Sequence, residues 1–442
     1  MLSWVSPGAR SRVAGVLFYT VMGCNYLWGG ISLYVTSYLR QYDSDLTMND
    51  TAILLPLGFA FNVCGYPLSH ALVQKLGVKK SIIIGWVCIT SSAFISSFVT
   101  NFYVFVFTYT ATFNLGQGLV FLTALLSAWE YYPHQKSTST GIMTMGYGIG
   151  PFAYNFVCLA LVNPENHAPS VQSEGGEKYF SADVADRVPA MLRYLGLMWL
   201  VTGIIGISIL KVPKSLQKGG RHEHIQDLPT PIEDTEEDED DSITLEATPS
   251  PNQSHIRNEC LDVRDGLSTT QFKLLTLMGF CSLMLPYYII DVYKNIGEDY
   301  FDNDAFLTTV GSFGLLSNGL SRCLWGPSQD KWGFKKVYWT TLGLQGAMCL
   351  LFIFLRQDAV IFTIAVIGAC ACDGAHFTIF TSETGKVFGV KYSIIFYVFI
   401  SLGLSGGTLL ALVLNKYVRP VIGYSAFFWM FFVLTCCSAC LL

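Results

Sequence analysis

Apolar stretches follow one another along almost the whole chain, with short polar loops between them. Each stretch has about 20 residues, enough for a helix to cross the roughly 30 Å hydrocarbon core of a bilayer. Inside lipid a helix satisfies its own backbone hydrogen bonds, so these runs predict helices and an all-α membrane protein. We expect twelve membrane-spanning helices, at residues 13–36, 51–73, 81–99, 102–128, 140–161, 191–211, 271–292, 305–326, 337–356, 359–381, 393–414 and 421–442.

A long polar segment divides the chain near its middle. Residues 212–270 contain a continuous acidic run at 233–241, which cannot bury apolar surface and is expected to be disordered. The chain then consists of an N-terminal six-helix half, 1–211, the linker 212–270, and a C-terminal six-helix half, 271–442. The linker is either a solvated connection or a regulatory loop, since its Thr-Pro and Ser-Pro dipeptides suit a kinase.

The composition indicates the class of protein, and the charge distribution indicates its orientation in the membrane. Hydrophobic residues make up 52% of the chain and charged residues 13%, which excludes a soluble domain. Lysine and arginine gather in the loops on the same side as both termini, which places the termini in the cytoplasm. The net charge of −5 comes largely from the acidic linker, and no basic surface suggests nucleic acid. We expect a monomer in the lipid bilayer, of either the plasma membrane or an organelle.

A short basic loop occurs twice in the sequence, once in each half. It reads QKLGVKK at 74–80 and DKWGFKK at 330–336. Glycine permits a tight turn, aspartate is an acceptor at a helix end, and the basic residues hold the loop at the anionic inner leaflet. The duplication predicts a two-fold transporter architecture. The expected gating residues are Gly326, Asp330, Lys331, Gly333, Lys335 and Lys336, with Lys75, Gly77, Lys79 and Lys80 in the first half.

The second copy, beginning at Gly326, resembles the G-x-L-x-D-R/K-x-G-R/K-R/K loop of the major facilitator superfamily. That resemblance implies two pseudo-symmetric six-helix bundles with a cavity between them. The first copy departs from the family pattern, with His70 where glycine is usual and Gln74 where the aspartate is usual. If the aspartate latches a neighbouring helix in the family, the first-half latch is weakened here.

Three further segments resemble the oxalate/formate antiporter and monocarboxylate transporter branch: residues 25–28 (NYLW), 129–136 (WEYYPHQK) with 146–151 (GYGIGP), and 318–322 (NGLSR). Residues 388–392 and Glu383 are also similar to nodulin-like members. The resemblance implies a secondary transporter that moves a small organic anion, foremost a monocarboxylate, by alternating access with proton coupling or anion exchange. The lysine that oxalate carriers use in the eleventh span is absent around Ser401, which argues against oxalate.

Arg322 is the basic residue placed within a predicted span. A cation in this position costs at least about 2.5–3.5 kcal/mol unless it faces a cavity or a partner. Its planar guanidinium can bind a carboxylate through two hydrogen bonds. It therefore either binds substrate or braces the bundle in a permanent ion pair. Asn318 lies one turn earlier on the same face and can orient it.

Asp373 and His376 lie three residues apart in the tenth span, so they share a helix face. Asp373 is the expected counter-charge of Arg322. A carboxylate that is alternately paired and protonated would couple proton movement to anion movement, and His376 could relay the proton. The alternative is that both side chains only hydrogen-bond to neighbouring helices.

Polar and small residues complete the expected site. Asn25, Tyr26, Asn114 and Gln117 are candidates to line the cavity, although polar groups in spans also join helices to one another. Gly146 and Gly150 in the fifth span match Gly403 and Gly407 in the eleventh. Such pairs allow helices to approach closely, which a rocking movement needs.

Other classes of protein find little support. The sequence has no phosphate-binding loop, no HExxH motif and no nucleophile elbow in a suitable context, so we expect neither an enzyme nor a cofactor. Cys436, Cys437 and Cys440 have no histidine or carboxylate beside them, so we expect no metal site. The remaining alternatives are a transporter of a neutral solute or amino acid, and a transporter-like sensor that moves nothing.

Overall fold

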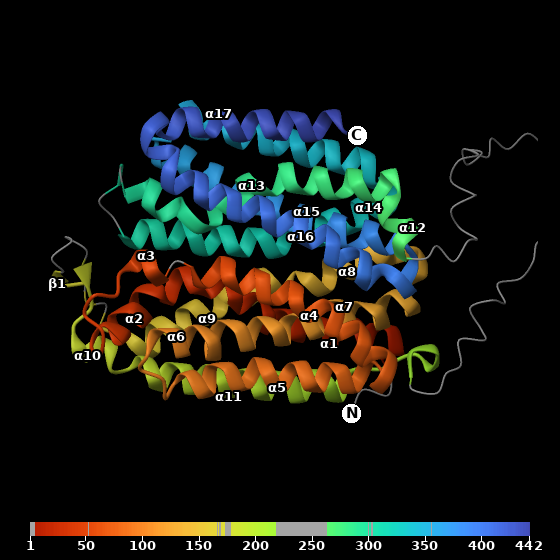
Figure 1. The fold of residues 1–442 in the computed structure, drawn as a ribbon, viewed down its shortest axis with the longest axis horizontal. Coiled ribbons are helices and arrows are strands. Elements are labelled where there is room, and N and C mark those ends of the chain that lie inside the picture. Colours follow the sequence, from red (N-terminus) through yellow and green to blue (C-terminus); the bar gives the residue numbers. More distant parts are fainter. Residues whose placement is uncertain are drawn as a thin grey trace, which may run out of the picture.

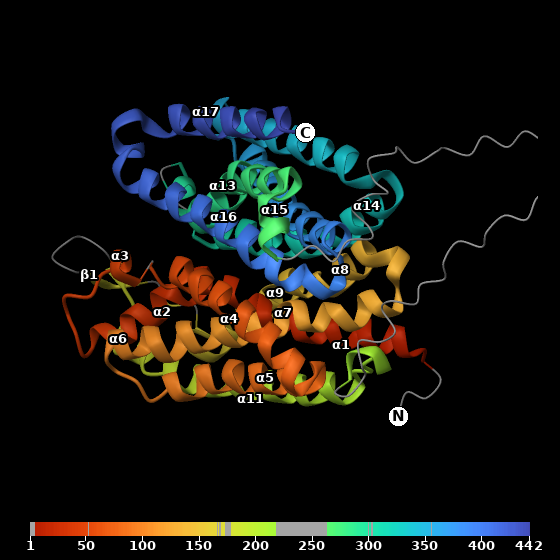
Figure 2. The same cartoon turned by 45° about the vertical axis from the view of Figure 1, so that its right-hand side comes forward.

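The structure is a computed structural model that describes residues 5–51, 53–165, 167, 169–172, 178–217, 263–298, 300–301, 304–354 and 356–442. The acidic run 233–241 and the kinase sites expected in the linker lie outside the described residues. Helices dominate the described part, and they form two layers that lie side by side in both views (Figure 1, Figure 2). Both termini lie at the same end of the helix bundle (Figure 1).

The first layer, red to yellow-green in Figure 1, contains the elements up to residue 217. They are α1 (Pro7–Met22), η1 (Gly23–Leu27), α2 (Trp28–Arg40), α3 (Met48–Thr51), α4 (Leu54–Leu76), α5 (Val78–Ser96), α6 (Phe102–Phe105), η2 (Val106–Ala111), α7 (Thr112–Tyr131), η3 (Pro133–Gln135), α8 (Lys136–Thr144), α9 (Gly146–Val162), β1 (Val171–Gln172), β2 (Lys178–Tyr179), α10 (Ala182–Ala185), α11 (Val188–Ile209) and η4 (Lys214–Leu216). The two short strands pair antiparallel, with Val171 opposite Tyr179.

The second layer, green to blue, contains the elements from residue 263 onward. Its elements are α12 (Val263–Ser268), α13 (Thr270–Glu298), α14 (Asp304–Phe354), α15 (Ala359–Val387), α16 (Gly389–Tyr417) and α17 (Arg419–Cys440). The layers meet along two seams, where α4 packs against α16, and where α8 and α9 pack against α14.

Ten helical stretches within the described residues are long and apolar enough to cross a membrane. One of them, Thr309–Phe354, contains two rods because α14 breaks at Gly333. Helix α4 is not among the ten but is itself 23 residues long. Each of the twelve predicted spans overlaps one of these rods.

The duplicated basic loop has the same backbone in both halves. Gly77 has φ 83° and ψ 164°, and Gly333 has φ 78° and ψ 166°. These angles lie in a region that residues with a Cβ rarely adopt, which explains why glycine stands at both positions. The repeat that was read from the sequence is therefore a repeat of local structure.

The glycine pairs expected to aid rocking pack inside the halves. A Cβ at Gly146 or Gly150 would overlap the backbone of α1 near Thr20, and one at Gly403 or Gly407 would overlap α13. Their matching places reflect the matching packing of α9 on α1 and of α16 on α13.

Other glycines make the close approach between the two layers. A Cβ at Gly148 would overlap Gly319, one at Gly141 would overlap the Arg322 carbonyl, and one at Gly326 would overlap the Ser137 carbonyl. Helices α8 and α9 therefore touch the first rod of α14 (304–332) backbone to backbone.

We expect Gly150→Ala to destabilise the protein by about 1–3 kcal/mol, because the new methyl group must displace the Thr20 carbonyl. Thermal unfolding in detergent measures this as a lower Tm. Gly343→Ala is the matched control, since nothing lies within 4 Å of a Cβ built there. Equal Tm values for the two variants would contradict close packing of Gly150 against the Thr20 carbonyl.

Candidate functional site

A cavity lies between the two layers and takes its walls from both. The lining residues are Asn25, Tyr26, Phe59, Asn62, Val63, Tyr66, Gln117, Phe121 and Tyr147 from the first layer, and Tyr287, Phe377, Tyr397, Ser401, Leu404 and Ser405 from the second. It encloses about 40 Å³, which is room for about three water molecules. In this conformation the layers are too close to admit a larger solute.

Aromatic rings from opposite layers meet around the cavity. Phe59 contacts Tyr287 with ring centroids 5.1 Å apart, Tyr66 contacts Tyr397 at 5.7 Å, and Tyr147 lies over Phe377 at 6.4 Å. Such contacts contribute about 0.5–1.5 kcal/mol each beyond the area that they bury. Because each pair joins one layer to the other, the cavity can open only when these rings separate.

Arg322, on the first rod of α14, is fully buried behind one of these ring pairs. Its Cζ atom lies 5.1 Å from the centre of the Tyr147 ring and 5.0 Å from that of Phe377, so both rings make cation–π contacts. Its Nε and Nη2 atoms donate to Asn318 Oδ1 at 3.1 and 2.8 Å. Nη1 has no hydrogen-bond partner among the described residues.

Asp373, on α15, is also fully buried and reaches Arg322 only through an amide. Its Oδ2 atom accepts from Asn318 Nδ2 at 2.5 Å, while Oδ1 has no partner in the described part of the chain. The sequence suggested a direct Arg322–Asp373 ion pair. In this structure the side chain of Asn318 stands between the two charges instead.

His376 shares the helix of Asp373 but has other partners. Its Nε2 atom is 2.8 Å from Gln345 Oε1 on the second rod of α14 (334–354), and its ring packs edge-on against Tyr338 at 5.7 Å. Gln345 in turn donates to the Ser282 carbonyl and to Thr435 Oγ1. His376 therefore belongs to a polar network inside the second layer, and no described contact links it to Asp373.

The first-layer candidates line two cavities, and Asn25 belongs to both. Asn25, Tyr26 and Gln117 line the cavity described above, and Gln117 Nε2 donates to Tyr147 Oη at 2.7 Å. Asn114 lies in a smaller neighbouring hollow of about 10 Å³, where Nδ2 donates to the Thr110 carbonyl.

Sequence reasoning missed most of the aromatic wall. Tyr66, Tyr287, Phe377 and Tyr397 sit within predicted spans, where an aromatic residue carries no signal that separates cavity lining from ordinary packing. As for metals, no group of three histidine, cysteine or carboxylate side chains comes together among the residues that the structure describes.

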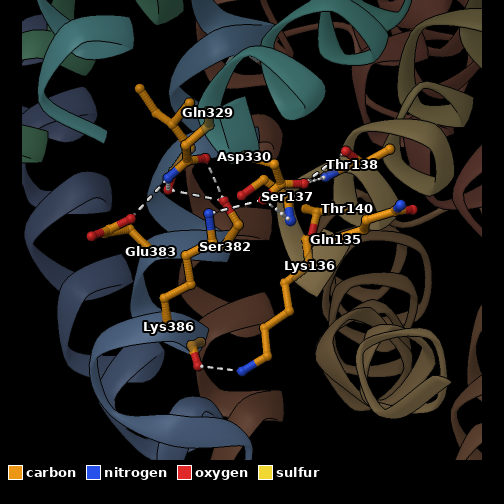
Figure 3. A network of polar contacts seen from close by, with 12 residues as sticks. Gln135, Lys136, Ser137, Thr138, Thr140, Gln329, Asp330, Ser382, Glu383 and Lys386 are labelled. Atoms are coloured by element: carbon orange, nitrogen blue, oxygen red, sulfur yellow. Dashed lines mark hydrogen bonds and ion pairs between the residues drawn. The ribbon is translucent and has the colours of Figure 1, made fainter. Parts of the chain in front are cut away.

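A polar network joins the first layer to the second (Figure 3). Asp330 accepts from the backbone N–H groups of Ser137 and Thr138, at 3.3 and 2.7 Å, and from Thr138 Oγ1 at 2.7 Å. These N–H groups belong to the first turn of α8. The N–H groups of a first turn have no hydrogen-bond acceptor within their own helix, so Asp330 supplies one. Lys386, on α15, pairs with the same carboxylate at 2.9 Å.

A second contact runs in the opposite direction. Lys136, at the start of α8, donates to the carbonyl of Gly385 in the last turn of α15 at 3.1 Å. A carboxylate thus meets a helix N-terminus and an ammonium meets a helix C-terminus, the two arrangements that the helix dipole favours. We call these contacts of Asp330, Lys386, Lys136 and Gly385 the latch.

The first-half loop has a different arrangement. Gln74, which stands where the second half has Asp330, contacts His70 on its own helix at 2.8 Å. The basic residues of both loop copies are exposed, namely Lys75, Lys79, Lys80, Lys331, Lys335 and Lys336. Of the two loop copies, the second makes the ion pair that joins the layers, through Asp330 and Lys386.

The chain has a distant relative among known proteins. No family model matches it. It is 25% identical to apicoplast pyruvate carrier 1 of Toxoplasma gondii over 439 residues, which cover 86% of this chain and 78% of that protein.

Several solved structures have the same architecture. The human organic anion transporter MFSD10 matches with a TM-score of 0.69 and 13% identity, over 99% of this chain and all 100% of its own. FucP, in its outward conformation, matches with a TM-score of 0.65 and 13% identity over 99% of both chains. The proton:xylose symporter XylE matches with a TM-score of 0.65 and 12% identity, over 98% of this chain and 95% of its own. The predicted fold class is confirmed: the chain is a multi-pass helical membrane protein with the major facilitator superfamily fold.

Proposed function

We propose that this protein is a secondary transporter of a small organic anion, a monocarboxylate, which it moves by alternating access with proton coupling or anion exchange. The observation that carries the proposal is Arg322. Its guanidinium is fully buried beside the cavity between the two layers, and its Nη1 atom has no hydrogen-bond partner among the described residues.

An anion suits this site better than a neutral solute. A buried cation is tolerated in a membrane when it faces a counter-charge or a partner, and here the nearest carboxylate is held one amide away. A substrate carboxylate would supply both the missing charge and the missing acceptor. Charge-assisted hydrogen bonds of this kind are about twice as strong as neutral ones.

The comparisons favour the same class of substrate. The relative at 25% identity is a pyruvate carrier, and one structural neighbour is an organic anion transporter. A xylose symporter shares the fold as well, so the architecture alone does not choose the substrate. Arg322 and the pyruvate carrier together support a monocarboxylate.

The way in which the cavity is closed supports alternating access. Tyr147 belongs to the first layer and Phe377 to the second, and together they cover Arg322. When the layers rock apart, the two rings separate and the guanidinium exchanges its cation–π contacts for the substrate carboxylate. Asp373, close to Arg322 and able to bind a proton, is the coupling residue in this scheme.

Uptake into proteoliposomes tests the function directly. We expect saturable uptake of pyruvate and of short 2-hydroxy acids, and no comparable uptake of oxalate, glucose or alanine. Accelerated uptake under an inward proton gradient indicates symport, and acceleration by internal carboxylate indicates exchange. Indifference to every carboxylate would contradict the proposal, and saturable binding without movement would indicate a sensor.

Arg322→Lys tests the role of the guanidinium. We expect a fall in transport efficiency of at least about tenfold, because a point ammonium cannot reproduce a planar two-point contact. Arg356→Lys is the matched control, since Arg356 donates to Tyr300, Ser425 and backbone carbonyls away from the cavity.

A purely structural Arg322 gives a different result. If it only braces Asp373, the double substitution Arg322→Ala with Asp373→Ala should restore folding and some transport, because no unpaired charge is left in the membrane. Full activity in Arg322→Lys would remove Arg322 from the mechanism.

The latch holds the cytoplasmic side closed in this scheme, with both termini in the cytoplasm. We expect Asp330→Asn to shift the protein toward the inward-open form, because the amide removes the charge that attracts Lys386 and the first turn of α8. The distance between spin labels at the exposed positions Lys79→Cys and Lys335→Cys, in a background without native cysteines, measures the opening.

Asp358→Asn is the matched control for the latch. Asp358 also accepts from backbone N–H groups at a helix start, but those groups belong to α15 of its own half. An unchanged distance distribution in Asp330→Asn would show that the latch does not hold the closed form.

A further inference from the structure

We propose that Asn318 is a positioning residue: its amide keeps Arg322 and Asp373 from pairing directly, so that Arg322 retains one N–H edge for the carboxylate of the substrate. This inference rests on the proposed function and deepens it, because it assigns the element that links the proton site to the anion site.

The contacts of the amide are specific. Asn318 Oδ1 accepts from two nitrogens of Arg322, and Asn318 Nδ2 donates to Asp373 Oδ2. Arginine offers only donors and a carboxylate only acceptors, so this orientation of the amide satisfies both neighbours and the reverse orientation satisfies neither. An aspartate at the same place would pair with Arg322 itself, four residues along the helix.

The bridge leaves each charged group incomplete. Arg322 Nη1 and Asp373 Oδ1 both lack partners among the described residues, although both side chains are fully buried. A direct ion pair would give both atoms a hydrogen-bond partner at once. A buried donor and a buried acceptor that both lack partners are costly in a membrane, so the surrounding helices have to keep the two side chains apart.

Close packing of α14 on α15 enforces it. A Cβ at Gly374, next to Asp373, would overlap the carbonyl of Asn318. Ser321 Oγ, one turn along α14, approaches both the Asn318 carbonyl and the Ala371 carbonyl, at 3.0 and 3.1 Å. The backbone of α14 is thereby held against α15, with the amide of Asn318 between the two charges.

The other groups around Asp373 do not compete for a proton near neutral pH. The titratable side chains that act on it are Arg322 from α14, Tyr26 from η1, Tyr287 from α13, Tyr397 from α16, and Cys370 and Cys372 from its own helix. Phenols and thiols are neutral at ordinary pH and the guanidinium is always charged. Asp373 is therefore the group of this set whose charge can change.

The consequence for binding has a definite sign. Ionised Asp373 competes with the substrate carboxylate for the positive charge of Arg322. A proton on Asp373 removes the competitor, so lower pH favours anion binding. The linkage is limited to one proton, so the apparent affinity changes by at most about tenfold per pH unit.

Removing the amide should expose this competition. In Asn318→Ala the guanidinium and the carboxylate can meet directly, so we expect KM for pyruvate near neutral pH to rise about tenfold or more. We also expect KM to recover toward the wild-type value on acidification, and in the double variant Asn318→Ala with Asp373→Asn, which has no competing carboxylate. Initial rates of uptake into proteoliposomes, measured across the pH range, give these values.

Ser317→Ala is the matched control. Ser317 is the neighbouring residue on α14 and also bonds to α15, through the Ile367 carbonyl, but it does not touch Arg322 or Asp373. We expect it to keep the wild-type KM at every pH. If Asn318→Ala does not fold, Asn318→Ser provides the same test, because a hydroxyl is too short to bridge both charges.

A raised KM in Asn318→Ala that is the same at every pH, and that Asp373→Asn does not correct, would overturn the inference, as would an unchanged KM. Either result leaves the proposed function standing when the wild type transports carboxylates and Arg322→Lys does not. Absence of carboxylate uptake by the wild type, by contrast, rejects the proposed function itself.

Discussion

A positive charge buried within a membrane-spanning helix is the constraint on which the site depends. Arg322 cannot lose its proton and cannot reach water in this conformation, so its surroundings must compensate for its charge. Two aromatic faces and one amide oxygen do so incompletely, since one nitrogen keeps no partner among the described residues. In the proposed function, an anion that reaches this site supplies the missing hydrogen-bond acceptor and the missing negative charge.

The two layers are arranged so that access to this charge depends on their relative position. Where α8 and α9 meet α14, glycines stand at the contact points. Without side chains there, the backbones of the two layers can approach closely. The latch at one end consists of polar contacts with helix ends, which are individually modest and can break and form again. Close apolar contact together with weak polar closure suits a movement between two states of similar free energy.

Much of the architecture could be predicted from the sequence, because long apolar runs and a duplicated loop report on features that every membrane helix must have. The glycines at 77 and 333 belong to the predicted repeat, and their φ angles are positive and differ by only a few degrees. Arg322 was found because a charge in an apolar span is conspicuous. The amide bridge through Asn318 was not, since helix spacing shows that Asn318 and Arg322 share a face but not that Asp373 meets the same amide. His376 shows the same limit: three residues from Asp373, it turns to Gln345 on another rod.

The central claim is that Arg322 recognises a carboxylate by its charge, and competition between an acid and its own amide tests this most directly. Purified protein in detergent is given radiolabelled pyruvate, and binding is competed with unlabelled pyruvate or with pyruvamide, which matches its shape without the charge. The account predicts that pyruvate displaces the label at concentrations at least about 100-fold lower than pyruvamide does, because loss of a charged two-point contact costs about 3 kcal/mol or more. Equal displacement by the two compounds would contradict it.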